Sequence, residues 1–300
     1  MRRLLLAGLA LIAAAVPAFA HGGGAAHEVG WTWDASIIVP LALAAILYAV
    51  GFARLWRRGV RGRHARLSGA ALFAAGWMVL AFALVSPLHA WGELMLTAHM
   101  IEHEAMMIVA APLLVLARPG PVLLWGLPRF GRRAVAATLR AGAVAGPWRV
   151  VSTPFVATII HAVAIWVWHA PPLFTAALTN EAVHWLQHLC FFGSALLFWW
   201  AVTQTKSYGA AISDLFVTTL HTGFLGVLML VSGRVWYPAQ LTDAAHWGLT
   251  LIEDQQLAGL IMWIPGGMVY VVAALWLAGI WISSAGRSAQ ARGGYGAGLG

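Results

Sequence analysis

The chain has 300 residues, of which 61% are hydrophobic and only 9% are charged, and it contains 17 tryptophans. This composition excludes an ordinary soluble domain and predicts an integral membrane protein embedded in a lipid bilayer. The net charge of +8 does not indicate nucleic-acid binding, because the arginines lie in short gaps between apolar segments rather than on one basic face.

The first twenty residues resemble a secretory signal peptide. Arg2 and Arg3 precede a short apolar stretch, and Ala18 and Ala20 form an A-x-A cleavage pattern. An uncleaved first span is the alternative, although the apolar part is short for a bilayer. Residues 21–35 are then expected to form a Gly- and His-rich tail outside the membrane.

Apolar segments within residues 36–283 predict an all-α transmembrane bundle of seven helices. The predicted spans are 36–54, 68–86, 94–117, 154–170, 182–203, 211–232 and 256–283. Six arginines in 54–67 and six more in 118–153 place both loops in the cytoplasm, so the N-terminus is expected outside and the C-terminus inside. The small, polar residues of 284–300 predict a disordered cytoplasmic tail.

The histidines concentrate at the end of the predicted bundle that is expected to face outward. Those at helix ends or in loops on this side are His89, His99, His103, His169, His184, His188 and His246. His161 and His221 lie deeper, near the middle of the fourth and sixth predicted spans. The pattern predicts a histidine-lined outer half of the bundle.

Two histidine pairs have the spacing of one helical turn. His99 and His103 begin the third predicted span, and His184 and His188 begin the fifth. Side chains at i and i+4 share a helix face and can reach a common ion. If the two spans are neighbours, four imidazoles converge, and such a set suits zinc, copper, iron or nickel. The alternative for an isolated membrane histidine is an interhelical hydrogen bond.

Sulfur and carboxylate groups lie near these pairs. Met100 and Cys190 carry sulfur, which shifts the preference toward Cu(I), although methionine and a lone cysteine are also common apolar filler. Glu102 and Glu104 flank His103. Either glutamate could orient an imidazole through its second nitrogen, or simply reach the membrane interface.

The sequence contains none of the familiar motifs of nucleophilic or zinc-dependent catalysis. It has no G-x-S-x-G, no P-loop, no H-E-x-x-H and no C-x-x-C. We therefore expect a protein that is not an enzyme.

Three strings, AHMIEHEAMMIVAAPLLVLARP, HWLQHLCFFGSALLFWW and EDQQLAGLIMWIPGGMVYVVAALW, resemble the CtaG family of cytochrome c oxidase assembly factors in its multi-span, caa3-type bacterial form. The resemblance covers about residues 36–283. Its motif residues fall on His99, His103, His184 and His188, with Asp254 in the third string.

The resemblance implies a metallochaperone of the bacterial cytoplasmic membrane that serves the respiratory chain. Its partners would be a haem-copper oxidase subunit and an extracytoplasmic copper donor, and its cargo would be copper, as Cu(I). The leading hypothesis from the sequence is therefore an outward-facing copper site formed by the four paired histidines.

Two other functions remain open from the sequence. A haem-binding electron-transfer or haem-handling protein could use the paired histidines as axial ligands. A metal or proton transporter could use His161, His221 and Glu102 as a path through the bilayer, although the inner half lacks a matching series of polar groups.

Overall fold

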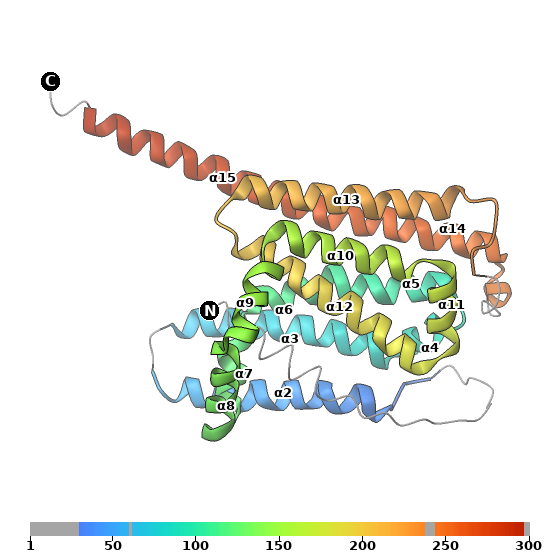
Figure 1. Ribbon diagram of the computed structural model, residues 1–300, viewed down its shortest axis with the longest axis horizontal. Coiled ribbons are helices and arrows are strands. Elements are labelled where there is room, and N and C mark those ends of the chain that lie inside the picture. Colours follow the sequence, from blue (N-terminus) through green and yellow to red (C-terminus); the bar gives the residue numbers. More distant parts are fainter. Residues whose placement is uncertain (1–29, 60–61, 238–243, 297–300) are drawn as a thin grey trace.

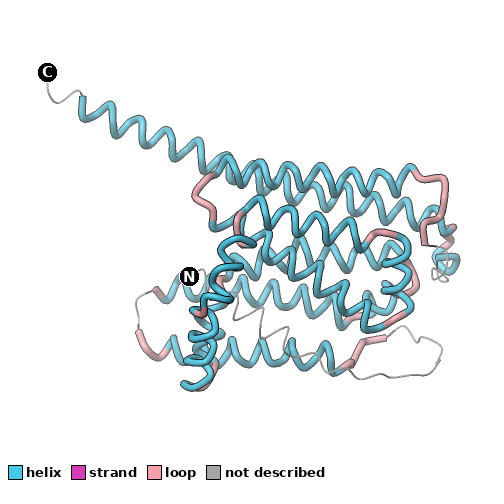
Figure 2. The backbone as a smooth tube through the Cα atoms, viewed as in Figure 1, coloured by secondary structure: helices cyan, strands magenta, loops and turns pink. Residues whose placement is uncertain are grey.

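The computed structural model describes residues 30–59, 62–237 and 244–296, with side chains as far as residue 285. Every regular element in these ranges is helical (Figures 1 and 2). The predicted signal peptide lies outside the described residues, as does most of the expected tail at 21–35.

The helices follow one another along the chain, with two π-helical segments and one short 3-10 turn among them. They are α2 (Ala35–Trp56), α3 (Arg63–Val85), α4 (Pro87–Gly92), α5 (Leu96–Glu104), π segment η1 (Ala105–Ala110), α6 (Ala111–Ala117), α7 (Gly120–Gly126), α8 (Arg129–Arg140), α9 (Gly142–Val151), α10 (Pro154–Trp168), α11 (Pro171–Thr179), α12 (Glu181–Gln204), α13 (Tyr208–Val231), 3-10 turn η2 (Ala244–Trp247), α14 (Leu251–Ile261), π segment η3 (Met262–Gly266) and α15 (Gly267–Gly296).

Six helical stretches in the described residues are long and apolar enough to cross a membrane. They are Ala35–Trp56, Arg63–Val85, Leu96–Ala117, Glu181–Gln204, Tyr208–Val231 and Leu251–Ala285. The remaining predicted span, 154–170, falls on α10, whose 15 residues are too few to cross unaided. Thr153 is extended before Pro154, and α9 meets α10 there at a bend of 82°. The number of spans reaches seven only if this bent pair crosses as one.

The long helices lie side by side, and short helices cover the two ends of the bundle (Figure 1). Helices α7, α8 and α9 cross one end, which we call the arginine end because α8 carries Arg129, Arg132, Arg133 and Arg140. Helices α4 and α11 lie at the opposite end, which we call the histidine end. The short α7 lies within the predicted loop 118–153, in a part of it that is apolar and interrupted by proline and glycine.

Two helical runs form the centre of the bundle: α12, and the continuous run from α5 through η1 to α6. Their apolar stretches are 67% and 61% buried, against 22% for α2 and for α3. The π segment η1 ends at Ala110, shortly before Pro112. Because proline has no N–H to donate within a helix, it accounts for the wider turn at this point. The Trp199 indole N–H donates to the Met107 carbonyl at 3.0 Å and ties α12 to η1. These central helices carry the paired histidines.

Helices α13 and α14 cross at a pair of glycines. A Cβ added to Gly226 would lie 2.7 Å from the Gly259 carbonyl oxygen, and one added to Gly259 would meet the Gly226 carbonyl oxygen at 2.5 Å. Small residues allow such close backbone approach in membrane bundles. The close crossing holds the second half of α14 against α13.

Helix α15 runs to Gly296, through most of the segment 284–300 for which the sequence predicts disorder. Extending an existing helix costs little, because each added residue gains a hydrogen bond once the first turns have formed. The Ala, Ser, Gln and Arg residues that open this segment are compatible with such an extension.

Candidate metal centre

Four imidazole rings from the two central helices meet at the histidine end. His99 and His103 come from α5, and His184 and His188 come from α12. Their ring centroids form a closed circuit, with separations of 4.1 Å from His99 to His103, 5.0 Å from His103 to His188, 4.4 Å from His188 to His184 and 5.7 Å from His184 to His99. The structure thus brings together the four histidines that share the i, i+4 spacing.

Several ring nitrogens of this circuit are buried without a hydrogen-bond partner among the described residues. They are Nε2 of His99, His184 and His188, and both ring nitrogens of His103. The His99 Nδ1–H donates to the Gly92 carbonyl at 3.1 Å, so the lone pair of the neutral ring lies on Nε2. Buried polar atoms are costly unless a partner satisfies them. Each of these nitrogens could accept a hydrogen bond or coordinate an ion.

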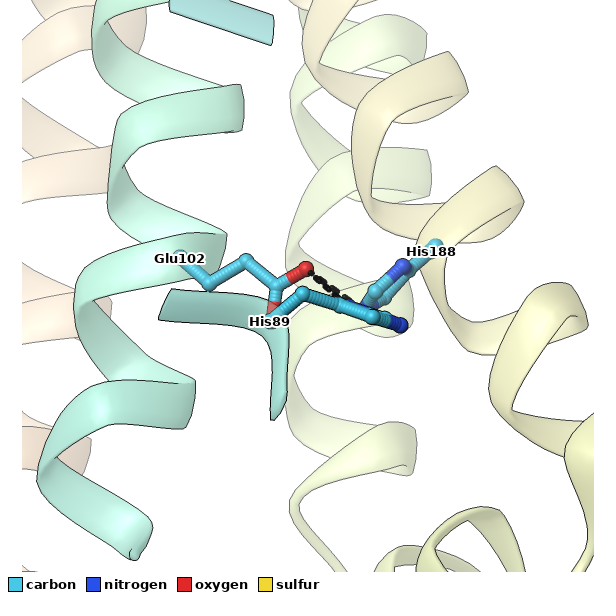
Figure 3. Close-up of side chains that lie close together, drawn as sticks. All are labelled: His89, Glu102 and His188. Carbon is cyan, nitrogen blue, oxygen red and sulfur yellow. Dashed lines mark hydrogen bonds and ion pairs between the residues drawn. The ribbon is translucent and has the colours of Figure 1, made fainter. Parts of the chain in front are cut away.

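A carboxylate and a fifth histidine adjoin the circuit (Figure 3). The His89 Nδ1–H of α4 donates to Glu102 Oε1 at 2.7 Å, and the same oxygen lies 3.8 Å from His188 Nε2. One donor atom from each of His89, Glu102 and His188 lies within 4.8 Å of the other two. We call His89, His99, His103, His184, His188 and Glu102 together the histidine cluster.

The electrostatics of His89 follow from its carboxylate partner. Burial by itself lowers the pKa of the His89 imidazole. The Glu102 carboxylate at hydrogen-bond distance raises this pKa, and Glu93 and Asp34 raise it further. The pKa of His89 therefore lies above its usual value. His89 also stacks on His184, with ring centroids 5.5 Å apart. The Glu102 carboxylate thus favours the protonated form of His89 more than the buried surroundings alone would.

Asp254 positions the histidine-bearing helix rather than facing the cluster. Its two carboxylate oxygens accept the backbone N–H groups of Leu96 and Thr97 at 2.8 and 3.0 Å, and the Thr97 hydroxyl donates to its carbonyl at 3.1 Å. These N–H groups open α5 and would otherwise lack partners. The carboxylate from α14 thus fixes the first turn of the helix that carries His99.

Gly92 makes room for the buried carboxylate. A Cβ added there would lie 2.9 Å from Glu102 Oε2. The same residue ends α4 and supplies the carbonyl that orients His99. One glycine thus permits both contacts.

Two phenylalanines close the cluster on another side. Phe174 of α11 meets His99 edge-on at 4.9 Å, and Phe191 of α12 meets His103 at 4.7 Å between ring centroids. His169 lies against the same two phenylalanines, at 6.4 and 5.7 Å, and its Nδ1–H donates to the Ile165 carbonyl. The two apolar rings thus lie between His169 and the α5 histidines of the circuit.

His161 belongs to a different group in the middle of the bundle. Its Nδ1–H donates to the Ser194 hydroxyl at 2.9 Å, which in turn donates to the Phe191 carbonyl, and the Tyr270 hydroxyl approaches His161 Nε2 at 3.5 Å. Both ring nitrogens therefore have protein partners. This is the interhelical hydrogen bonding that the sequence left as the alternative for a membrane histidine.

The remaining candidates lie outside the histidine circuit. Met100 is buried in a separate apolar cluster with Phe174 and Tyr237, and Cys190 is half-buried against the main core. Glu104 is buried, and a Cβ added to Gly266 would lie 2.9 Å from its Oε2. His221 is half-buried on α13, and His246 is exposed on η2.

Sequence reasoning missed Gln187, Gly92 and Tyr270. Gln187 is fully buried next to His188, and both polar atoms of its side chain lack a partner among the described residues. The string HWLQH offered a signal, because an amide in an apolar run is costly to bury. Gly92 and Tyr270 offered none, since their roles depend on helices distant in the sequence.

Comparisons with known proteins give one family match and several distant relatives. The family described as "Cytochrome c oxidase caa3 assembly factor" (Caa3_CtaG) matches residues 46–284. Two proteins named as uncharacterized, from Mycobacterium bovis and Mycobacterium tuberculosis, are each 28% identical to this chain over 247 residues. An uncharacterized protein of Mycobacterium leprae is 23% identical over 265 residues. No solved structure matches the chain significantly.

The alignments cover 78 to 84% of this chain, whereas the chain spans only 36 to 39% of the length of these relatives. The mycobacterial names assign no activity. The family match extends over well over half of the chain and over all the residues of the histidine cluster. The predicted resemblance is confirmed, and the protein belongs to the family of cytochrome c oxidase caa3 assembly factors.

Proposed function

We propose that this membrane protein assists oxidase assembly by holding Cu(I) as cargo at the histidine cluster and passing it to a haem-copper oxidase subunit. The histidine end would face the extracytoplasmic side of the bacterial cytoplasmic membrane, where a copper donor could load it. The family supports the oxidase pathway. The cargo, its ligands and the direction of transfer are the parts that require a test.

One observation carries the proposal: four imidazoles from α5 and α12 touch in a closed circuit and leave buried nitrogens without partners. Neutral imidazole is a good ligand for copper. Glu102 would balance part of the charge of a bound cation. Because the ligand side chains are buried, the ion would be largely shielded from bulk water.

The same geometry favours an ion over haem. Two axial imidazoles must lie on opposite faces of a porphyrin, whereas these four rings are in mutual contact at centroid separations of 4.1 to 5.7 Å. Purified protein is therefore expected to show no Soret band. A Soret band that disappears with His184→Asn would support haem instead.

The test is the copper content of detergent-purified protein, isolated anaerobically with reductant. The variant His99→Asn/His103→Asn removes two imidazole donors and leaves a smaller polar amide at each position. His246→Asn, at the exposed turn η2, is the matched control. We expect stoichiometric copper in the wild type and in the control, and at least a tenfold loss in the double variant. Equal, negligible copper in all three proteins would refute the copper proposal and leave a scaffolding role in assembly.

A further inference from the structure

A pocket of about 250 Å³ opens beside the histidine cluster, where the start of α2, the end of α4 and the start of α12 meet. Three carboxylic acids line it: Asp34, Glu93 and Glu181. Its lining contains no lysine or arginine. We call these three residues the acidic mouth.

The floor of the pocket belongs to the histidine cluster. His184 and His188 line it, although they are only 7% and 5% exposed, and Nε2 of each has no partner among the described residues. His184 lies against His99 inside the circuit, and His188 lies against His103. The pocket therefore connects carboxylates near the surface with buried imidazole donors.

The two kinds of donor suit successive stages of binding. Carboxylates near the surface attract a hydrated cation and raise its local concentration. Buried imidazoles bind the same ion more tightly once its water is lost, because soft and borderline metals prefer nitrogen to carboxylate oxygen. Asp34 and Glu181 also stay in place, since Asp34 caps α2 and Glu181 begins α12.

We propose that the acidic mouth is the access route by which a monovalent soft metal cation reaches the histidine cluster from the histidine end. This inference rests on the proposed function, since it presumes that the cluster holds such a cation. The carboxylates set the rate of loading, and the imidazoles set how many ions are retained.

The experiment follows binding of Ag(I), a closed-shell analogue of Cu(I), to the full-length protein in neutral detergent and nitrate buffer. Stopped-flow quenching of tryptophan fluorescence gives the loading rate, because Trp185 lines the pocket. The variant Asp34→Asn/Glu93→Gln/Glu181→Gln removes three charges at nearly constant volume, and Asn can still cap α2. Glu253→Gln is the matched control, since Glu253 lies outside the pocket and Gln preserves its capping box.

At low ionic strength the triple variant should load about tenfold more slowly than wild type, with the same final stoichiometry. The difference should vanish at high salt, and Glu253→Gln should behave as wild type. Equal loading rates in the triple variant and the wild type, with binding still lost in His99→Asn/His103→Asn, would overturn the access route alone. A wild type that binds no Ag(I) would overturn the route and the proposed function together.

Discussion

The histidines of this protein differ in how their ring nitrogens are used. Both nitrogens of His161 have protein partners, in Ser194 and Tyr270. Neither nitrogen of His103 has one among the described residues, although the side chain is only 1% exposed. A histidine whose hydrogen bonds are complete stabilises the helix packing by itself, whereas one buried without partners has a desolvation cost that a bound ligand or water would offset.

His89 and Glu102 should stabilise the fold even without metal. His89→Phe keeps a ring but leaves the Glu102 carboxylate buried without its 2.7 Å donor. We expect the free energy of unfolding of the metal-free protein to fall by about 2 kcal/mol. Denaturant titration in mixed micelles measures it. His246→Phe, at an exposed position, is the control, and an equal loss in both variants would show that the hydrogen bond contributes nothing.

At the scale of the element, the first turn of α5 is held by a residue of another helix. Asp254 of α14 accepts two backbone N–H groups there, so His99 and His103 depend on it for position. The family resemblance includes Asp254 among the motif residues, and the structure supplies a helix-capping reason for a carboxylate at that point.

Asp254→Ala should therefore act on stability more than on metal binding. Two N–H groups of α5 lose their acceptor, and the expected loss is about 1 to 2 kcal/mol of unfolding free energy. Thermal unfolding of the metal-free protein is the measurement, and Asp254→Asn should recover part of the loss. If Asp254→Ala left metal-free stability unchanged but abolished copper binding, the residue would be a ligand and the capping explanation would be wrong.

The crossing of α13 and α14 gives a second element-level prediction. Gly226→Ala would place a methyl 2.7 Å from the Gly259 carbonyl oxygen and 3.0 Å from the Trp263 backbone nitrogen, so the helices must separate. We expect a loss of roughly 1 to 3 kcal/mol. Gly193→Ala is the control, because nothing lies within 4 Å of its new methyl. Equal midpoints of thermal unfolding for the two variants would contradict the close crossing.

The sequence predicted the long helices and the paired histidines because both depend on local periodicity. Apolar length marks a span, and i, i+4 spacing marks a shared face. It could not predict that His89 bonds Glu102, because that contact depends on the turn between α4 and α5. The sequence also failed to predict the bend at Pro154, which leaves α10 shorter than the expected span. Hydropathy alone does not reveal such a helix break.

At the scale of the whole molecule, the two ends of the bundle carry different kinds of polar side chains. Arginines gather on the helices that cross one end, and the histidine cluster with its acidic mouth lies at the other. The positive-inside rule predicts that the arginine end faces the cytoplasm. Copper loading from outside the cell requires that same orientation.

Single cysteines in a Cys190→Ala background test the orientation. Ala245→Cys lies at the exposed turn η2 of the histidine end, and Ala137→Cys is exposed on α8 of the arginine end. A membrane-impermeant maleimide should label Ala245→Cys in cells whose outer barrier is permeable to the reagent, and Ala137→Cys only after the cytoplasmic membrane is opened. The reverse pattern would place the histidine cluster on the cytoplasmic side.

X-ray absorption at the copper edge of anaerobically loaded protein tests the central claim most directly, because it reports the ligand atoms themselves. Met100 packs in a separate apolar cluster, and the buried atoms of the histidine cluster that lack partners are imidazole nitrogens and one carboxylate oxygen, Glu102 Oε2. We predict a first shell of nitrogen with the outer-shell scattering of imidazole, lost in His99→Asn/His103→Asn. A copper–sulfur shell that survives this double substitution would contradict a histidine site and direct attention to Met100 or Cys190.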